Sequence, residues 1–380
     1  MDFFEFIFIY LGPFLYNLIF VSLWILWFMY HREEENQGLK YYFRKYLRDK
    51  VWFYGITGSI IVVFLIFLFS YVIWNTDVDD AITSAVQAVV QGINPYQEDV
   101  VEHHINSEII LSRYHYFPPD LITYSLFYYI FGSIFYPGLQ TYWFVPLHII
   151  LIIPGYWVIT QLIEWPHHQL FPFTVLLITP FLFTNSMLMW FFFLIGYYFY
   201  EKKEQRILGM TFYVLAASVK YMVGFIIFFY FIQSLKELYY EKQFTNWRVL
   251  GQKLAPYAIS SLILTLICLP FGFFDVITSV FLYQGDPQYR AEVAQFVGPL
   301  LIEILKFLNL ISWYLPILVV IVFLALIILW QQPTYTQIIH FSFLAMIILP
   351  FYGTELFITL PFFFWFKEGF RAYRDTNQGE

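Results

Sequence analysis

Charge is scarce in this sequence, and that scarcity decides the class of protein. Only 12% of the 380 residues are charged, whereas soluble proteins usually carry about 25%. Hydrophobic residues make up 60% of the chain and aromatic residues 24%, and the mean hydropathy is +0.64. This composition disfavours intrinsic disorder, secretion as a soluble domain and nucleic-acid binding. It predicts a multi-pass integral membrane protein.

Cysteine and the common nucleotide-binding and hydrolase motifs are also lacking. Cys268 is the single cysteine, so no intramolecular disulfide can form. The sequence has no P-loop, no glycine-rich dinucleotide fingerprint and no Gly-x-Ser-x-Gly elbow, which disfavours ATP-driven pumping and serine hydrolysis. The apolar run from Phe3 to Tyr30 is too long for a cleavable signal peptide, so we expect it to remain as a span.

Long hydrophobic runs dominate what is present. The longest lie at 5–29, 51–74, 139–163, 254–273, 312–331 and 335–351, and shorter ones lie at 170–184, 187–200, 207–219, 221–235 and 354–367. A membrane span needs about 20 apolar residues, so the pattern predicts an all-α polytopic bundle of about 11 spans. No repeat or linker interrupts it. Residues 1–380 are therefore predicted to form a single transmembrane domain, with an extracytoplasmic loop at 75–136.

The charged residues predict which loops lie on which side of the membrane. Segment 32–50 is rich in Lys and Arg, and the positive-inside rule places it in the cytoplasm. Segment 75–120 holds eight acidic residues and one basic residue, Arg113, so we expect it outside. If 121–136 is a re-entrant or juxtamembrane element rather than a full span, the remaining basic turns also become cytoplasmic. Those turns are 201–206, 236–253 and 367–374.

Four cations are left outside or within the membrane by this arrangement: Arg113, Lys220, Arg290 and Lys306. Ionisable residues in such places are functional candidates by default, because an unpaired charge near the hydrocarbon is costly. The cytoplasmic basic turns need no role beyond orienting the chain.

The outer loop is predicted to begin with an amphipathic helix. Apolar pairs recur every fourth residue from Ala81 to Val90, and Gly92 and the turn Asn94-Pro95-Tyr96 follow. The helix is preceded by three aspartates, Asp77, Asp79 and Asp80. One of them could serve as an N-cap. Three exceed that need, and their mutual repulsion favours a carboxylate that accepts a proton, so we favour a catalytic role over capping.

The far end of the loop presents aromatic rings, a histidine and an arginine at the membrane boundary. It reads Arg113-Tyr-His115-Tyr116-Phe-Pro118-Pro119-Asp120, and the paired prolines hold the preceding residues extended. An interfacial aromatic belt is the alternative interpretation. The histidines at 103, 104 and 115 match no metal-ligand spacing, so we expect solvated side chains and no metal site.

The order of these features resembles the integral-membrane glycosyltransferases of the GT-C superfamily. Within it, the closest likeness is to the polyprenol-phosphate-sugar-dependent mannosyltransferases of glycosyltransferase family 87. The matching positions are Asp77 to Asp80, Gly92 to Tyr96 and Tyr116 to Pro118. A second stretch is also similar to that family: a helix started by Asn185, the basic turn 201–206, and a helix that ends at Lys220.

The resemblance implies inverting transfer of mannose or another hexose from a polyprenyl-phosphate donor to an acceptor hydroxyl on the extracytoplasmic face. The acceptor would be a lipid, a glycan or a glycoprotein, and no cofactor is implied. An aspartate would act as general base, with Asp77 the first choice, then Asp80 and then Asp79. Cations would stabilise the leaving phosphate; the candidates are Lys220, Arg290 and Arg113. Candidate substrate contacts are His115, Tyr116, Tyr96 and Asn185.

Two other classes stay open. A polytopic transporter or lipid flippase would need broken or charged segments within the bilayer. Pro146, Pro154, Pro180 and Pro316 could break helices, but the spans carry almost no charge. A non-catalytic subunit of a membrane complex is the third possibility. In each case we expect membrane lipids as neighbours, and the plasma membrane as the location in a prokaryote.

Overall fold

The computed structural model describes residues 77–105, 108–139, 143–162, 186–220 and 223–285, together with the isolated positions 320 and 323. These residues are helical apart from one two-stranded hairpin and the connecting turns. The predicted spans at 5–29, 51–74, 170–184, 335–351 and 354–367 lie outside the described residues, and so does the span at 312–331 apart from positions 320 and 323. The total of about 11 membrane spans therefore stays a prediction.

Two of the described helices are long and apolar enough to cross a membrane. They are α7 (Val145–Leu162) and α12 (Trp247–Cys268), which continues as the 3-10 turn η6 (Leu269–Phe271). Helix α7 lies within the predicted run 139–163 and continues through Pro154, so this proline does not break it. Helix α12 begins seven residues before the predicted run at 254, because hydropathy does not detect the polar first turns that Asn246 caps.

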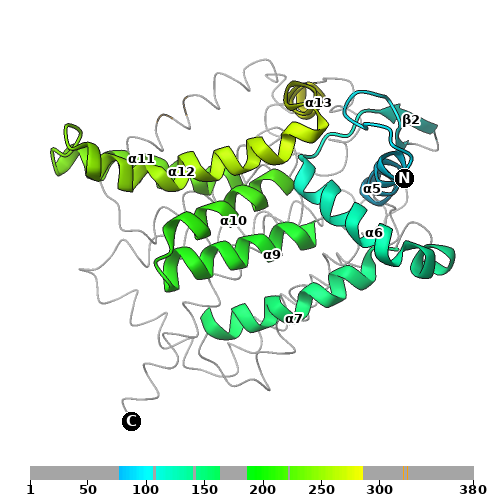
Figure 1. The fold of residues 1–380 in the computed structure, drawn as a ribbon, viewed down its shortest axis with the longest axis horizontal. Helices are drawn as coiled ribbons and strands as arrows, with labels where there is room; N and C mark the ends of the chain where they lie inside the picture. Colours follow the sequence, from blue (N-terminus) through cyan, green and yellow to red (C-terminus); the bar gives the residue numbers. More distant parts are fainter. Residues whose placement is uncertain are drawn as a thin grey trace, which may run out of the picture.

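Three more helices complete the described part of the bundle. They are α9 (Ser186–Tyr197), continued by the π-helix η4 (Tyr198–Lys202), α10 (Arg206–Val219) and α11 (Gly224–Tyr240). In Figure 1, α9 and α10 lie side by side. Gly209 makes this possible, since a Cβ there would lie 2.6 Å from the backbone nitrogen of Tyr200. Small residues at such crossings allow two backbones to approach closely.

One end of the bundle carries a separate group of elements, which we call the end unit. It consists of α5 (Asp77–Val90), the turn at 91–100, the hairpin β1 (Val101–Ile105) and β2 (Glu108–Ser112), residues 113–117, and α13 (Phe273–Gly285). Figure 1 shows α5 and α13 end-on at the same end of the bundle, where α7, α9 and α10 run across the view. Helix α6 (Pro118–Leu139) begins beside the end of α10 and runs outward past α5, and α7 then returns toward the bundle.

The predicted amphipathic helix is confirmed as α5. The first two apolar pairs of its predicted face are buried, with Ala81, Ile82, Ala85 and Val86 all at 0% exposure, whereas Val90 at the end of the helix is 52% exposed. Gly92 follows the helix with φ of +79°, the left-handed conformation that glycine adopts without strain. Inside the fold, the indole of Trp143 donates to the Thr83 hydroxyl at 3.1 Å, which joins α5 to the start of α7.

Several details of the outer loop differ from the sequence-based expectation. Residues 101–105 and 108–112 form the two strands of a hairpin, with His103 opposite Ile110, where the sequence predicted only a polar loop. Residues 273–285, for which the sequence predicted no element, form a helix across the end of the bundle. The 121–136 element is part of a continuous helix of 22 residues, and the paired prolines stand at its first two positions, as the sequence predicts.

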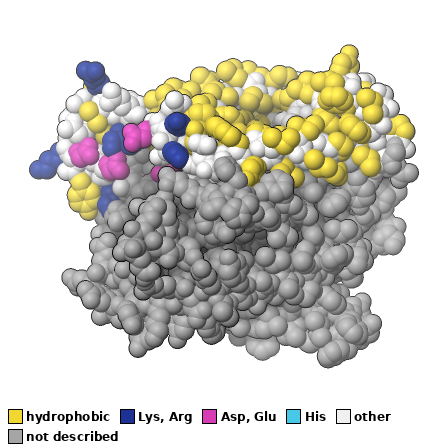
Figure 2. Space-filling view, turned by 90° about the horizontal axis from the view of Figure 1, so that it is seen from below, with side chains coloured by type: hydrophobic (Ala, Val, Ile, Leu, Met, Phe, Trp, Pro, Cys, Tyr) yellow, Lys and Arg dark blue, Asp and Glu magenta, His cyan; other side chains and the backbone are white. Residues whose placement is uncertain are grey.

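The opposite end of the bundle contains the two basic segments 201–206 and 236–253, which include the turns between η4 and α10 and between α11 and α12. We call this the turn end. Figure 1 shows it at the far side from the end unit, and Figure 2 shows charged side chains gathered there beside a band of hydrophobic side chains. Exposed apolar residues occur on the outer faces of α7 and α12, among them Ile153, Trp157, Leu262 and Leu266.

Candidate functional site

The end of α10 meets residues 113–117, which are about a hundred positions earlier in the chain. Lys220 is the C-cap of α10, and its Nζ lies 4.8 Å from the centroid of the Tyr116 ring. The backbone N–H of Phe117 donates to the Ser218 carbonyl at 3.4 Å. Both Lys220 and Tyr116 are half-buried. An ammonium above an aromatic face is attracted to the ring and still presents N–H donors to a ligand.

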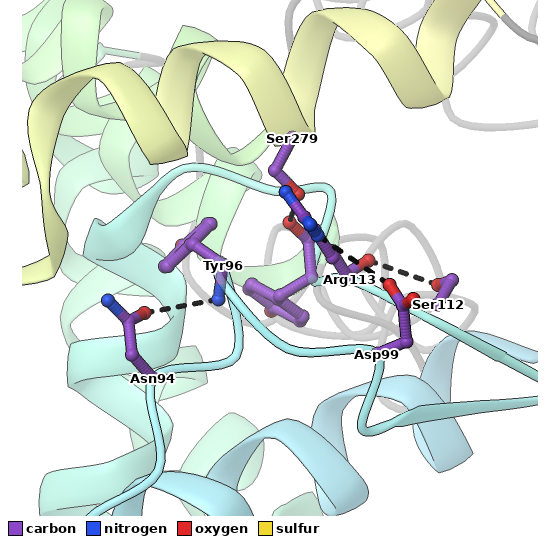
Figure 3. A network of polar contacts seen from close by, with 7 residues as sticks. Asn94, Tyr96, Asp99, Ser112, Arg113 and Ser279 are labelled. Carbon is purple, nitrogen blue, oxygen red and sulfur yellow. Dashed lines mark hydrogen bonds and ion pairs between the residues drawn. The ribbon is translucent and has the colours of Figure 1, made fainter.

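The Asn-Pro-Tyr turn supports this contact from behind. The Asn94 side chain accepts from the Tyr96 N–H at 3.1 Å and donates to the Phe271 carbonyl at 2.8 Å; Figure 3 shows the first of these bonds. The Tyr96 hydroxyl donates to the Tyr116 carbonyl at 2.7 Å. The predicted substrate contact Tyr96 is thus fully buried, and in this structure it holds the backbone beneath Tyr116.

His115 belongs to the same aromatic cluster. Its ring centroid lies 4.2 Å from that of Tyr116, and the side chain is 5% exposed. Tyr114 packs against Tyr116 edge to face with centroids 5.6 Å apart. The structure therefore brings together four of the residues singled out from the sequence: Lys220, His115, Tyr116 and Tyr96.

Arg113 points to a different partner. Its Nε lies 3.6 Å from the Asp99 carboxylate, and the two side chains are 46% and 66% exposed. Figure 3 shows this pair, and near it Ser279 of α13, whose hydroxyl donates to the carbonyl of the neighbouring Tyr114. Two further predicted site residues, Arg290 and Asn185, lie outside the described residues.

The three candidate bases stand in the first turn of α5. The helix begins at Asp77, and the side chains of Asp77 and Asp79 lie outside the described part of the structure. Asp80 is half-buried, and its carbonyl accepts from the Ser84 hydroxyl at 2.8 Å. The same hydroxyl accepts from the Glu102 N–H at 3.0 Å, which joins the start of α5 to the hairpin.

Asp120 is a buried carboxylate that the sequence showed only as one of several loop acids. It is 0% exposed, its Oδ2 accepts from the Tyr114 hydroxyl at 2.9 Å, and its Oδ1 accepts from the Leu121 N–H at 2.7 Å. Burial raises the pKa of Tyr114 well above its usual value, and the negative charge of Asp120 raises it further. The one sequence signal that could have drawn attention to Asp120 is its predicted place in the first turn of a helix.

No group of three or more His, Cys, Asp and Glu side chains that could hold a metal ion occurs among the described residues. Comparisons of the chain with protein-family models, with curated proteins and with solved structures found no match. What the site can do is therefore argued from its own groups, a half-buried ammonium and an aromatic surface beneath it; the role of the carboxylates at the start of α5 stays a prediction from the sequence.

Proposed function

We propose that this protein is an integral-membrane glycosyltransferase of the GT-C type. It would transfer mannose or another hexose from a polyprenyl-phosphate donor to an acceptor hydroxyl on the extracytoplasmic face, with inversion. The observation that carries this proposal is the contact between Lys220 and Tyr116. It joins the two stretches of sequence that separately resemble the family, because one supplies the lysine and the other the aromatic segment.

The proposed reaction assigns a role to each group. The acceptor oxygen attacks the anomeric carbon while Asp77 or Asp80 takes its proton. The bond between the anomeric carbon and the phosphate oxygen breaks, and the polyprenyl phosphate leaves with its electron pair. The Lys220 ammonium stabilises the negative charge that accumulates on that phosphate. Because the leaving group is already an anion, it needs a cation more than it needs a proton.

The arrangement of the helices supports a multi-pass membrane protein with its site on the outer side. The end unit and the basic turn end stand at opposite ends of the described helices. The positive-inside rule assigns the turn end to the cytoplasm, which leaves the end unit outside. The exposed apolar side chains of α7 and α12 lie between the two ends, where a bilayer would cover them.

The experiment that tests the proposal uses purified full-length protein in lipid nanodiscs with a panel of polyprenyl-phosphate hexoses. Release of free polyprenyl phosphate is measured with and without acceptor glycans. Sugar-dependent release from at least one donor is expected. If no donor releases phosphate while the protein moves intact lipid-linked sugar between the leaflets of a liposome, the protein is a flippase and the proposal is wrong.

A further inference from the structure

Asp120 has no assigned role in the proposed reaction, yet it is buried in the first turn of α6 and binds Tyr114 of the end unit. A carboxylate at 0% exposure destabilises the fold unless hydrogen-bond donors compensate its charge. Two such donors are the Tyr114 hydroxyl and the Leu121 N–H. Because a buried charge tolerates few alternatives, this bond fixes the side chain of Tyr114 more firmly than a bond between neutral groups would.

The Tyr114–Phe117 segment is held by contacts from several elements. Besides the Asp120 bond, the Ser279 hydroxyl of α13 donates to the Tyr114 carbonyl at 2.6 Å, the Tyr96 hydroxyl donates to the Tyr116 carbonyl at 2.7 Å, and the Phe117 N–H donates to the Ser218 carbonyl at 3.4 Å. These three contacts hold the backbone. The bond to the Asp120 carboxylate instead holds the side chain of Tyr114, and its acceptor is a charged group.

The direction of these bonds is also fixed. Burial raises the pKa of both Tyr96 and Tyr114 well above its usual value, and the charge of Asp120 raises each further. Both phenols therefore keep their protons at neutral pH and act as donors. Neither can reverse its bond, since its partner is an oxygen that only accepts.

We propose that Asp120 is a positioning residue for the candidate phosphate-binding site. Through Tyr114, its carboxylate holds the Tyr114–Phe117 segment in the arrangement that places the Tyr116 ring beneath the Lys220 ammonium. The link to a donor phosphate rests on the proposed function, whereas the positioning of Lys220 does not. A cation that is already held in place needs no rearrangement when negative charge accumulates on the leaving phosphate in the transition state.

The test measures the reactivity of Lys220 directly. Full-length protein in detergent micelles is treated with a trace of acetic anhydride, and acetylation at each lysine is followed by mass spectrometry. In Asp120→Asn we expect acetylation of Lys220 to become faster by about threefold or more, because the segment that covers it is released. Lys242, exposed in the turn end, is the internal control and should react equally in both proteins.

Tyr114→Phe provides a second, smaller change that removes the donor and leaves the charge. It should also speed acetylation of Lys220, and adding Asp120→Asn to it should partly restore the slow rate, because an amide tolerates the missing donor better than a carboxylate does. An unchanged Lys220 rate in the folded single variants would overturn the proposal. So would loss of folding in both, which would make the bond a general stability element.

Transfer assays separate this inference from the proposed function. If the wild-type protein transfers sugar, Asp120→Asn should lower kcat about tenfold with little change in the KM for the donor, since positioning acts mainly in the transition state. If the wild type transfers nothing but Lys220 acetylation changes as expected, the positioning role stands and the glycosyltransferase proposal fails.

Discussion

The two ends of the described helices use polar residues in opposite ways. At the turn end, Lys203, Glu204 and Lys242 are exposed. Two of these turn residues, Glu204 and Lys242, adopt positive φ angles of 56° and 53°. In the end unit, Tyr96 and Tyr114 are fully buried, and both donate hydrogen bonds within the fold.

In our proposal the turn end orients the chain in the membrane, and the end unit contributes to the site of the reaction. Exposed charges contribute about 0–1 kcal/mol each to stability and tolerate substitution, so the turn end needs only to be basic. Buried polar groups stabilise the fold only when each finds its partner, so they define a single arrangement. A site that binds a phosphate and a sugar needs such a defined arrangement, and the end unit provides one.

Replacing the first aspartate of α5 should give the largest effect. If Asp77 is the general base, Asp77→Asn lowers transfer about 10²- to 10⁴-fold. The helix should remain intact, because Asn is also a good N-cap. The rate of polyprenyl phosphate release and the far-UV circular dichroism spectrum measure the two effects.

Asp99→Asn is the matched control, since Asp99 is an exposed acid of the same unit. It should leave transfer unchanged. Full activity of Asp77→Asn would reduce Asp77 to a helix cap, and the same substitution would then be made at Asp80 and Asp79.

A substitution near the turn end should change stability and leave chemistry intact. In Gly209→Ala the new Cβ would lie 2.6 Å from backbone atoms of Tyr200, so overpacking should destabilise the protein by about 1–3 kcal/mol. Gly251→Ala is the matched control in α12, where a Cβ would meet nothing within 4 Å. Thermal unfolding in detergent should show a lower midpoint for the first variant and an equal or higher one for the second. Equal midpoints would mean that α9 and α10 do not pack as described.

The buried phenols of the end unit should make stability fall at alkaline pH. The raised pKa of Tyr96 keeps it protonated in the folded protein, while in the unfolded chain it ionises above about pH 10. Its stabilising contribution is therefore complete below about pH 10 and is lost as pH rises, by about 1.4 kcal/mol per pH unit. The advantage in unfolding free energy of wild type over Tyr96→Phe should shrink accordingly. An advantage that is constant from pH 9 to 11 would contradict the burial of Tyr96.

Arg113 should give the smallest effect. Because it forms an exposed pair with Asp99, Arg113→Gln should change the unfolding free energy by less than about 1 kcal/mol. Donor KM should also stay near the wild-type value, although the sequence made Arg113 a candidate phosphate ligand. A large rise in donor KM would show that Arg113 leaves Asp99 to bind the phosphate.

The local features of the end unit could be predicted from the sequence. The four-residue spacing of Ala81, Ile82, Ala85 and Val86 identified α5 and its buried face, and the glycine after it marked its end. The double proline marked the start of α6. Lys220 was correctly predicted at the end of a helix, since the apolar run stops there.

The long-range features could not be predicted, because they depend on contacts between distant segments. Each strand of the hairpin is five residues long, and the strand pattern of Val101 to Ile105 is weak because two histidines interrupt it. Hydropathy cannot show that α13 turns across the end of the bundle and bonds to Tyr114. The burial of Asp120 was equally invisible, since an acid beside a polar loop is usually exposed.

The most direct test of the account compares two lysines from the two ends. Release of polyprenyl phosphate is measured for Lys220→Met and Lys242→Met, both of which keep an apolar stem and lose a charge. We predict that Lys220→Met loses about 2–4 kcal/mol of transition-state stabilisation, or about 30- to 1,000-fold in rate, while Lys242→Met keeps the wild-type rate. Equal rates in the two variants would contradict the proposal that Lys220, where α10 meets the end unit, stabilises the donor phosphate.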